Sequence, residues 1–394
     1  MADLKNKGVM TRCIHGGHKS NDAYKALHTP IYMTSNFELA NDGTPINWGN
    51  SLYTNIYARD GNPNQWQLQD KLALLEGCED AVVLASGVAA LSAIFTTFLS
   101  VGDHVIFSKV CYSATTILFN DLLPKKGIEA TYVDTTNIEE IKNAIKPNTK
   151  LIHIETPGNP TTGITDIELV ANLAHKNNLL VSVDSTFASP YLQKPIELGA
   201  DLVMHSMTKY INGHGDCLGG CVLGSRELIE KIKLEAMVNY GGIISPFNAW
   251  LINRGLNTLP LRMKQHNENG MKVAKFLESC PAVRFIHYPG LKSHPQHELA
   301  KKQMNGDYAG MIAFDIIGNE DKKIKVMHNL EMIAHAVSLG DGESLIVHFE
   351  KTSPKMKYYP EIYKEGFYRF SVGLEDAEDI IADLKQAFEK TGLL

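Results

Sequence analysis

The sequence predicts an α/β fold, with a large domain built on a mostly parallel sheet and a smaller C-terminal α/β domain. Three observations lead to this prediction. Between residues 61 and 255 short apolar runs alternate with helical stretches, which is typical of a parallel sheet covered on both faces. After residue 256 a long helical stretch interrupts the alternation. Residues 1–60 show little periodicity and are expected to form an extended arm that packs on a neighbouring subunit.

The large domain is expected to begin with a helix and continue as strands and helices in turn. In the first helix Leu68, Leu72 and Leu75 recur at helical spacing, and Gly77 is a plausible C-cap. Strands are expected at residues 81–86, 103–107, 128–133, 151–156, 179–184, 200–206 and 219–224. Helices are expected at residues 88–99, 115–123, 138–145 and 170–178. In such a sheet a ligand binds beyond the carboxyl ends of the strands.

The small domain is expected to follow the helical stretch at residues 262–280. Its predicted strands lie at residues 283–290, 310–316, 336–340 and 367–375, and a final helix lies at residues 380–390. This part therefore has elements enough for a sheet of its own.

Composition narrows the class of partner. The 394 residues carry a formal net charge of -6, which provides no electrostatic footprint for nucleic acid or an anionic membrane. The first residues contain no apolar core of a secretory signal, and no run of about 18 apolar residues could span a bilayer. Six unpatterned cysteines argue against a disulfide framework. We expect a cytoplasmic protein that acts on a small molecule.

Lys209 is the first candidate for chemistry. It follows the apolar run at residues 200–206, and the hydroxyls of Ser206 and Thr208 flank it. Hydroxyls can bind a phosphate while a desolvated lysine forms an imine with an aldehyde. Upstream, another predicted strand ends at Asp184, whose carboxylate can pair with a pyridinium nitrogen. Together these residues favour pyridoxal 5'-phosphate (PLP) bound to Lys209 as a Schiff base.

Further candidates lie at neighbouring strand ends. Ser86 and Gly87 join a predicted strand to a helix, whose N-terminal amides could hold a phosphate. Tyr112 could stack on a flat cofactor, and Arg369 could bind a substrate carboxylate through two hydrogen bonds. Taken singly, each of these residues has an ordinary structural explanation. It is their order along the chain that favours a PLP site.

Metal and dinucleotide sites are poorly supported. The spacings His214-x2-Cys217-x3-Cys221 and His294-x2-His297 lack the paired clusters of a structural zinc site. The glycines of residues 213–219 do not have the GxGxxG spacing and do not follow the first strand of a unit. We therefore expect no metal.

Several long motifs resemble the Cys/Met-metabolism family of PLP enzymes, which includes methionine γ-lyase, the cystathionine lyases, cystathionine γ-synthase and the homoserine-ester sulfhydrylases. The resemblance runs from about Thr11 to the C-terminus. Its most specific motifs are YARDGNPN, LASGVAAL, ETPGNPTTGITD, VDSTFASPYLQKPIELGADLVMHSMTKYINGHGD, RFIHYPGLKSHPQHELAKKQM, AVSLGDGESL and RFSVGLED. It implies the aspartate-aminotransferase type of fold (fold type I).

The resemblance also implies roles for individual residues. It makes Lys209 the PLP lysine, Asp184 the partner of the ring nitrogen and Tyr112 the stacking, catalytic tyrosine. The remaining cofactor positions are the phosphate binders Gly87, Val88, Ser206 and Thr208, and the pair that reaches the adjacent subunit's phosphate, Tyr57 and Arg59. The positions near the substrate carboxylate are Asn159, Ser338 and Arg369. Shared sites require a dimer, and the family implies a homotetramer built as a dimer of dimers.

Within the family, Val337 before SLG and the GDGESL run look most like methionine γ-lyase. Three features depart from that enzyme. Ala114 replaces its active-site cysteine while the nearby Cys111 is displaced, Asn239 replaces its aspartate, and the segment 348–370 differs from the family's loop and is shorter.

The resemblance implies γ-elimination from a sulfur-containing or similarly γ-substituted L-amino acid. L-methionine, giving a thiol, ammonia and 2-oxobutanoate, is the first candidate substrate. The alternatives are a cystathionine γ- or β-lyase and a transferase such as cystathionine γ-synthase or O-acetylhomoserine sulfhydrylase. A non-catalytic PLP-binding protein is a remote alternative, since a binding module has no use for a matched acid and base.

Overall fold

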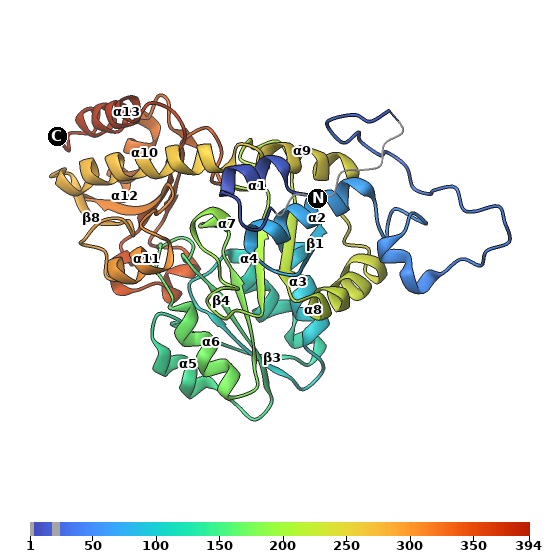
Figure 1. The fold of residues 1–394 in the computed structure, drawn as a ribbon. Coiled ribbons are helices and arrows are strands. Elements are labelled where there is room, and N and C mark those ends of the chain that lie inside the picture. The colour runs from blue at the N-terminus through green and yellow to red at the C-terminus, as the bar shows by residue number, and fades with distance from the viewer. Residues whose placement is uncertain (1–3, 18–23) are drawn as a thin grey trace.

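The computed structural model describes residues 4–17 and 24–394. Residues 1–3 and 18–23 of the expected arm lie outside the described residues. Within the described chain, two sheets with their helices form the body, and the segment before α2 projects from it (Figure 1). No helix of the described chain is long and apolar enough to cross a membrane.

The first sheet has seven strands in the order β1-β7-β6-β5-β4-β2-β3. β7 pairs antiparallel with β1 and β6, and the remaining neighbours pair in parallel. The strands are β1 (Asp80–Leu84), β2 (His104–Ser108), β3 (Glu129–Val133), β4 (Thr149–Glu155), β5 (Leu180–Asp184), β6 (Leu202–Ser206) and β7 (Gly220–Gly224). The mostly parallel sheet is thus confirmed.

Helices cover both faces of this sheet, and an apolar cluster lies between the sheet and the helices on each face. On one face α3, α8 and η4 pack against side chains such as Val82 and Val222, whereas on the other α2, α6 and α9 pack against Val83 and Val183. The helices up to this point are α1 (Val9–His15), η1 (Trp48–Tyr53), α2 (Pro63–Glu76), α3 (Gly87–Phe98), α4 (Ser113–Ile117), η2 (Leu118–Leu122), η3 (Pro124–Lys126), α5 (Ile138–Ala144), α6 (Ile167–Lys176), α7 (Ser189–Leu192), α8 (Arg226–Ile232), η4 (Lys233–Asn239) and α9 (Pro246–Leu256).

The helix ends follow from local side chains. Asn62 caps α2 by accepting a hydrogen bond from the Asn64 amide, and Pro63 occupies the first turn. Gly77 ends α2 in the left-handed conformation with φ 84°, which confirms the predicted C-cap. Ser86 caps α3 in the same way as Asn62, by accepting from the Ala89 amide. The cap fixes the turn that carries Gly87.

The second sheet has five strands in the order β10-β11-β12-β9-β8 and is mainly antiparallel. Its strands are β8 (Val283–His287), β9 (Met311–Ile316), β10 (Ala334–His335), β11 (Leu345–Phe349) and β12 (Phe367–Ser371). Its other elements are α10 (Leu259–Ser279), α11 (His297–Gln303), α12 (Glu320–Asn329), η5 (Pro354–Tyr358), η6 (Glu361–Tyr363) and α13 (Ala377–Lys390). Figure 1 shows α10 extending from the end of α9 into the layer that covers this sheet.

Two expectations from the sequence differ from the structure. Residues 336–340 were expected to form a strand, but β10 ends at His335 and the chain then turns, with positive φ at Ser338 and Gly340. Within the expected arm, α1 packs on α2 and α10, where Cys13 is fully buried and Arg12 donates to the Leu74 carbonyl at 3.3 Å. Among the described residues, the projecting arm lies within residues 24–60, whose base is held to the body where the Thr29 carbonyl accepts from Trp250 and the Leu52 carbonyl from Trp66 (Figure 1).

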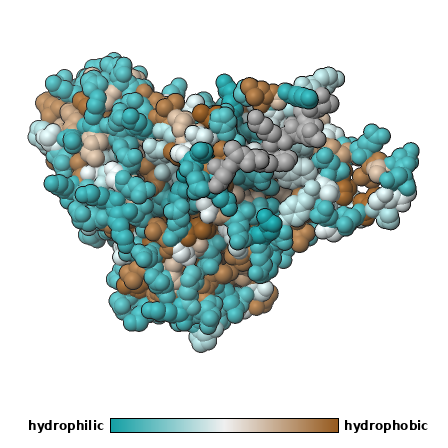
Figure 2. All heavy atoms as spheres, in the orientation of Figure 1, coloured by the Kyte–Doolittle hydropathy of each residue, from teal (hydrophilic) through white to brown (hydrophobic). Residues whose placement is uncertain are grey.

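Apolar side chains lie exposed on that arm. Tyr24 is 93% exposed, Leu27 78% and Met33 72%. Figure 2 shows apolar groups among the polar ones on the projecting segment. A surface of this kind is typical of a segment that packs against another chain.

Candidate active site

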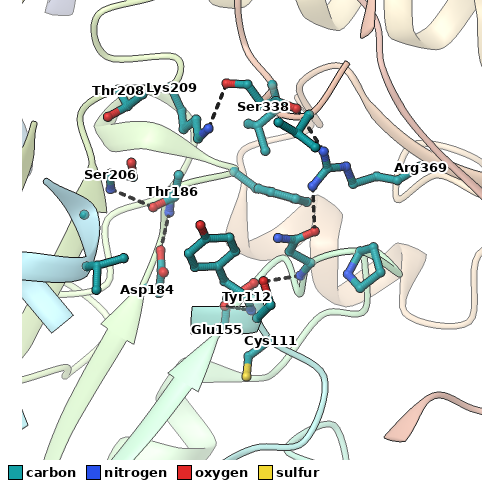
Figure 3. A pocket seen from close by; sticks show the side chains of 18 of the residues that line it. Cys111, Tyr112, Glu155, Asp184, Thr186, Ser206, Thr208, Lys209, Ser338 and Arg369 are labelled. Carbon is teal, nitrogen blue, oxygen red and sulfur yellow. Dashed lines mark hydrogen bonds between the residues drawn. The ribbon is translucent and has the colours of Figure 1, made fainter. Parts of the chain in front are cut away.

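The site lies where four strands of the first sheet end. β4 ends at Glu155, β5 at Asp184 and β6 at Ser206, while β1 leads into the turn at Gly87. These strands run in the same direction, so their carboxyl ends meet at one edge. A cavity of about 1040 Å³ opens there, and residues from both sheets line it. Figure 3 shows the side chains that point into this cavity.

Lys209 reaches the cavity from the turn after β6. Its Nζ donates a hydrogen bond to the Oγ of Ser338 at 2.8 Å. Burial lowers the pKa of the lysine amine, and the carboxylate of Asp341 opposes this effect. A lowered pKa increases the fraction of neutral amine, the form that attacks an aldehyde. In the view of Figure 3 Lys209 lies on one side of the cavity and Tyr112 on the other.

Asp184 is a buried acid without a cation beside it. Its Oδ1 accepts a hydrogen bond from the Thr186 amide at 3.0 Å. In the described chain it forms no ion pair within 4.0 Å. Burial therefore raises the pKa of the carboxyl group, and the hydrogen bonds from Thr186 offset only part of the rise. A protonated ring nitrogen would supply the cation that this acid lacks.

The Glu155 carboxylate binds the backbone on both sides of it, at Tyr112 and at Asn159. Its Oε2 accepts from the Tyr112 amide and its Oε1 from the Asn159 amide, each at 2.8 Å. Burial raises the pKa of this carboxyl group well above its ordinary value, and the nearby Asp184 raises it further. Glu155 was not predicted as a site residue, although it ends an apolar strand just as Asp184 does.

The turn at Gly87 is close to the end of β6. A Cβ placed on Gly87 would lie 2.8 Å from the Cβ and 2.9 Å from the Oγ of Ser206. Only glycine therefore fits, and Gly87 and Val88 at the start of α3 line the cavity together with Ser206 and Thr208. Thr208 accepts from the Gly219 amide at 3.1 Å, and the Ser206 amide donates to the Oγ1 of Thr186 at 2.8 Å. Amides at a helix N-terminus with adjacent hydroxyls suit a phosphate.

Arg369 lies in β12 and comes from the second sheet. Its Nη1 donates to the Oδ1 of Asn159 at 3.1 Å and its Nη2 to the Ser338 carbonyl at 2.9 Å. The buried Nε has no hydrogen-bond partner among the described residues. Burial lowers the pKa of the guanidinium, and it forms no ion pair with a carboxylate of the described chain. A substrate carboxylate would balance this charge.

Of the twelve predicted site residues, the cavity brings together ten: Gly87, Val88, Tyr112, Asn159, Asp184, Ser206, Thr208, Lys209, Ser338 and Arg369. Tyr57 and Arg59 do not line it. They lie on the projecting arm, with the guanidinium 5.1 Å from the Tyr57 ring centroid. Their predicted role toward an adjacent subunit stays a prediction.

Three positions singled out in the sequence have distinct surroundings. Cys111 lines the cavity, whereas Ala114 lies in α4 outside the lining residues. Asn239 ends η4 and does not line the cavity. The segment after His348 contributes Phe349, Lys355 and Tyr359 to the cavity wall, and this contribution was not predicted residue by residue.

The two metal-like spacings serve other purposes. The Nδ1 of His214 pairs with the Asn212 carbonyl, and Cys221 is buried in β7. Burial lowers the pKa of His294 to about 3, and its Nδ1 accepts from the Gln296 amide at 3.2 Å. Among the described residues no group of three or more His, Cys, Asp or Glu side chains is arranged to hold a metal ion.

The arrangement of Lys209, Asp184, the turn at Gly87 and Arg369 around one cavity suits a PLP-dependent enzyme of the α/β type. Comparison with known proteins agrees with this class. A family model described as Cys/Met metabolism PLP-dependent enzyme matches residues 10–389. The chain belongs to this family, and PLP is its cofactor.

Individual relatives and solved structures extend over nearly the whole chain. Canavanine γ-lyase of Rhizobium leguminosarum bv. trifolii is 48% identical over 97% of this chain and 96% of its own. L-methionine γ-lyase of Porphyromonas gingivalis is 46% identical over 98% of each chain. The crystal structure of metB from Corynebacterium glutamicum has a TM-score of 0.90 and 41% identity, covering 98% of this chain and 99% of that one. The chain is thus a PLP-dependent enzyme related to γ-lyases.

Proposed function

We propose that this enzyme catalyses γ-elimination from an L-amino acid that carries sulfur or a similar heteroatom on Cγ. The observation that carries the proposal is the placement of the Lys209 amine and the Arg369 guanidinium around Ser338, one bonding its hydroxyl and the other its carbonyl. A substrate whose carboxylate pairs with Arg369 would present its Cα to the lysine. The γ-lyase names of relatives 46–48% identical to this chain support the same reaction.

PLP, when bound, supplies an electron sink that stabilises negative charge at the substrate Cα. The residues of the chain then divide the proton transfers. Arg369 and Asn159 would hold the substrate carboxylate, and Lys209 would take the Cα proton, give that proton up so that its amine is neutral again, and only then take a Cβ proton. Tyr112 protonates the departing sulfur. Water completes the reaction, so that the products are a thiol, ammonia and 2-oxobutanoate.

Among substrates, L-methionine is the first we propose to test. Relatives of similar identity are named for methionine and for canavanine, so the reaction class is better supported than the leaving group. We expect lower selectivity toward methionine than in a methionine γ-lyase, because the segment 348–370, which is shorter than the family's loop and departs from it, contributes Phe349, Lys355 and Tyr359 to the cavity wall. One methylene in an apolar pocket discriminates by only about 1 to 3 kcal/mol.

The test is a panel of methionine, homocysteine, cystathionine, cysteine and canavanine, with the oxo acid identified. We expect 2-oxobutanoate from the γ-substituted members. Pyruvate as the sole oxo acid would show β-elimination. Turnover only when a homoserine ester is supplied together with a thiol would show a transferase.

The lysine is tested separately. Borohydride should fix the yellow cofactor to Lys209, and Lys209→Ala should abolish turnover while the far-ultraviolet circular dichroism is retained. Lys264→Ala, at an exposed lysine of α10, is the matched control. Label on another lysine, or full activity of Lys209→Ala, would contradict the proposed site.

For assembly, we propose a homotetramer made of two dimers that share active sites. The support is the projecting arm, with its exposed apolar residues and with Tyr57 and Arg59 away from the chain's own cavity. Within such a dimer the two side chains would reach the phosphate of the adjacent subunit.

A further inference from the structure

Lys355 lines the same cavity but has no part in the chemistry described above. It lies in η5, within the connection between β11 and β12, and is half-buried. Cys111, Phe349 and Tyr359 line the cavity with it. The lysine therefore belongs to the wall contributed by the second sheet, whereas Gly87 and Asp184 come from the first.

Contacts on both sides hold η5 in place. Met356 and Tyr359 are buried in an apolar cluster with Tyr363 and Phe367. On the other side the ring of Tyr358 packs edge-on against Tyr132, with centroids 5.2 Å apart. Lys355 is therefore carried by a segment that is packed against both parts of the molecule.

The charge of Lys355 is not neutralised within the described chain. No carboxylate of the described chain lies within 4.0 Å of the Lys355 Nζ. In the same connection, by contrast, Lys351 pairs with Glu365 and Lys364 with Glu361. Cys111 is the titratable group that acts on the Lys355 amine, and Tyr359 lines the cavity beside both. Burial raises the pKa of Cys111 and of Tyr359, so these two groups are neutral near pH 7.

A half-buried cation facing neutral groups loses part of its hydration without gaining a partner. Burial accordingly lowers the pKa of Lys355. A bound molecule with a negative group at that position would restore the lost interaction through a charge-assisted hydrogen bond. The rest of the wall is largely apolar, with Val337, Leu339 and Val347 among its residues.

We propose that Lys355 is a specificity-determining residue that favours substrates whose γ-substituent ends in a negatively charged group, such as a carboxylate. The proposal rests on the proposed function, in which Arg369 holds the α-carboxylate and the side chain extends into the remaining cavity. A neutral end would gain less from Lys355, and an ammonium end would be repelled.

The test uses three amino acids of similar length that have no leaving group on Cγ. L-2-aminoadipate ends in a carboxylate, L-norleucine in a methyl group and L-lysine in an ammonium group. Dissociation constants for the PLP-loaded enzyme are measured from the change in cofactor absorption. We expect aminoadipate to bind more tightly than norleucine, and lysine most weakly. Lys355→Met should reduce the preference for aminoadipate over norleucine by about 10- to 100-fold.

Two further variants separate charge from structure. Lys357→Met removes an exposed lysine of the same helix and should keep the wild-type preference. Lys355→Arg should keep most of it, because the charge remains. A wild-type enzyme with no preference for aminoadipate, or a preference unchanged in Lys355→Met, would overturn the proposal.

The binding measurement does not depend on turnover. If the preference is found but no γ-substituted amino acid yields 2-oxobutanoate, the proposed function fails and the role of Lys355 stands. If 2-oxobutanoate is released from methionine but the preference is absent, only the role of Lys355 fails.

Discussion

Gly87 is the residue at which the smallest change should have a clear effect. A methyl group there would meet the side chain of Ser206 at less than 3.0 Å, so the turn before α3 would have to move away from β6. We expect Gly87→Ala to weaken PLP binding by at least about 10-fold, because the helix amides and the hydroxyls would no longer converge. Equilibrium dialysis of PLP measures this.

The matched control for Gly87 is Gly8→Ala. A Cβ on Gly8 meets nothing within 4 Å, and the residue lies at the start of α1. PLP affinity should be unchanged in this variant. Equal PLP affinity of wild type and Gly87→Ala would show that the cradle is not built around this turn.

The buried carboxyl group of Asp184 should leave a signature in the pH dependence of stability. Burial raises its folded-state pKa above the ordinary 3.8, so between these two values the folded chain holds more protons than the unfolded chain. Stability from this group is therefore full below about pH 3.8 and is lost as the pH rises through the folded-state pKa. Asp184→Asn does not ionise and should avoid this loss.

The prediction concerns PLP-free protein, in which no ring nitrogen balances Asp184. We expect urea denaturation to show Asp184→Asn gaining stability relative to wild type between pH 4 and pH 8. The variant should nonetheless lose at least about 100-fold in turnover with PLP present, since a neutral amide cannot balance the charge of a protonated ring nitrogen. A stability difference that is the same at both pH values would contradict the raised pKa.

Among individual residues, the site residues at the ends of strands could be predicted from the sequence. Lys209 and Asp184 follow apolar runs, and the direction of the strands alone brings them to one edge. Glu155 carried the same signal and was overlooked. No such pattern marks Lys355. Its position depends on the packing of Tyr358 and Tyr359 against two different sheets, and no local sequence pattern predicts that packing.

Among the elements, strands with a long apolar run were predicted well and the segment 336–340 was not. Its composition is strand-like, yet Ser338 has φ 89° and Gly340 φ 74°. The turn places the Ser338 hydroxyl against Lys209 and brings Gly340 against Tyr210. Contacts with residues more than 100 positions away thus outweigh local propensity.

This turn supports a prediction about Gly340. A Cβ there would lie 2.8 Å from the Tyr210 amide nitrogen, next to the lysine, and φ is already positive. We expect Gly340→Ala to lower kcat/KM by at least about 10-fold through displacement of Ser338. Steady-state kinetics on the best substrate of the panel measures this.

Gly43→Ala is the control for backbone strain. Gly43 has a similar φ of 78°, but a Cβ there meets nothing within 4 Å. Both variants incur the cost of a positive φ, so a larger loss in Gly340→Ala than in Gly43→Ala would report the contact with Tyr210. If both lost activity to the same extent, the effect would be one of backbone strain and not of the site.

For the whole molecule, the arm leads to a prediction about assembly. Arg59→Ala should weaken PLP retention although the residue lies outside the cavity of its own chain. Arg254→Ala, at an exposed arginine of α9, should not. Analytical ultracentrifugation should give a mass four times the 43.6 kDa of one chain. A monomer that retains PLP as firmly as the oligomer would contradict shared sites.

The two walls of the cavity come from two different sheets. Recognition of the leaving group and the catalytic chemistry are therefore assigned to different parts of the chain. Lys209, Asp184 and Gly87 belong to one wall, whereas Phe349, Lys355 and Tyr359 belong to the other. A combinatorial library confined to the connection between β11 and β12 would therefore vary which leaving groups are accepted while the catalytic residues of the first sheet stay as they are. In such a library a variable recognition surface would face a constant reaction centre.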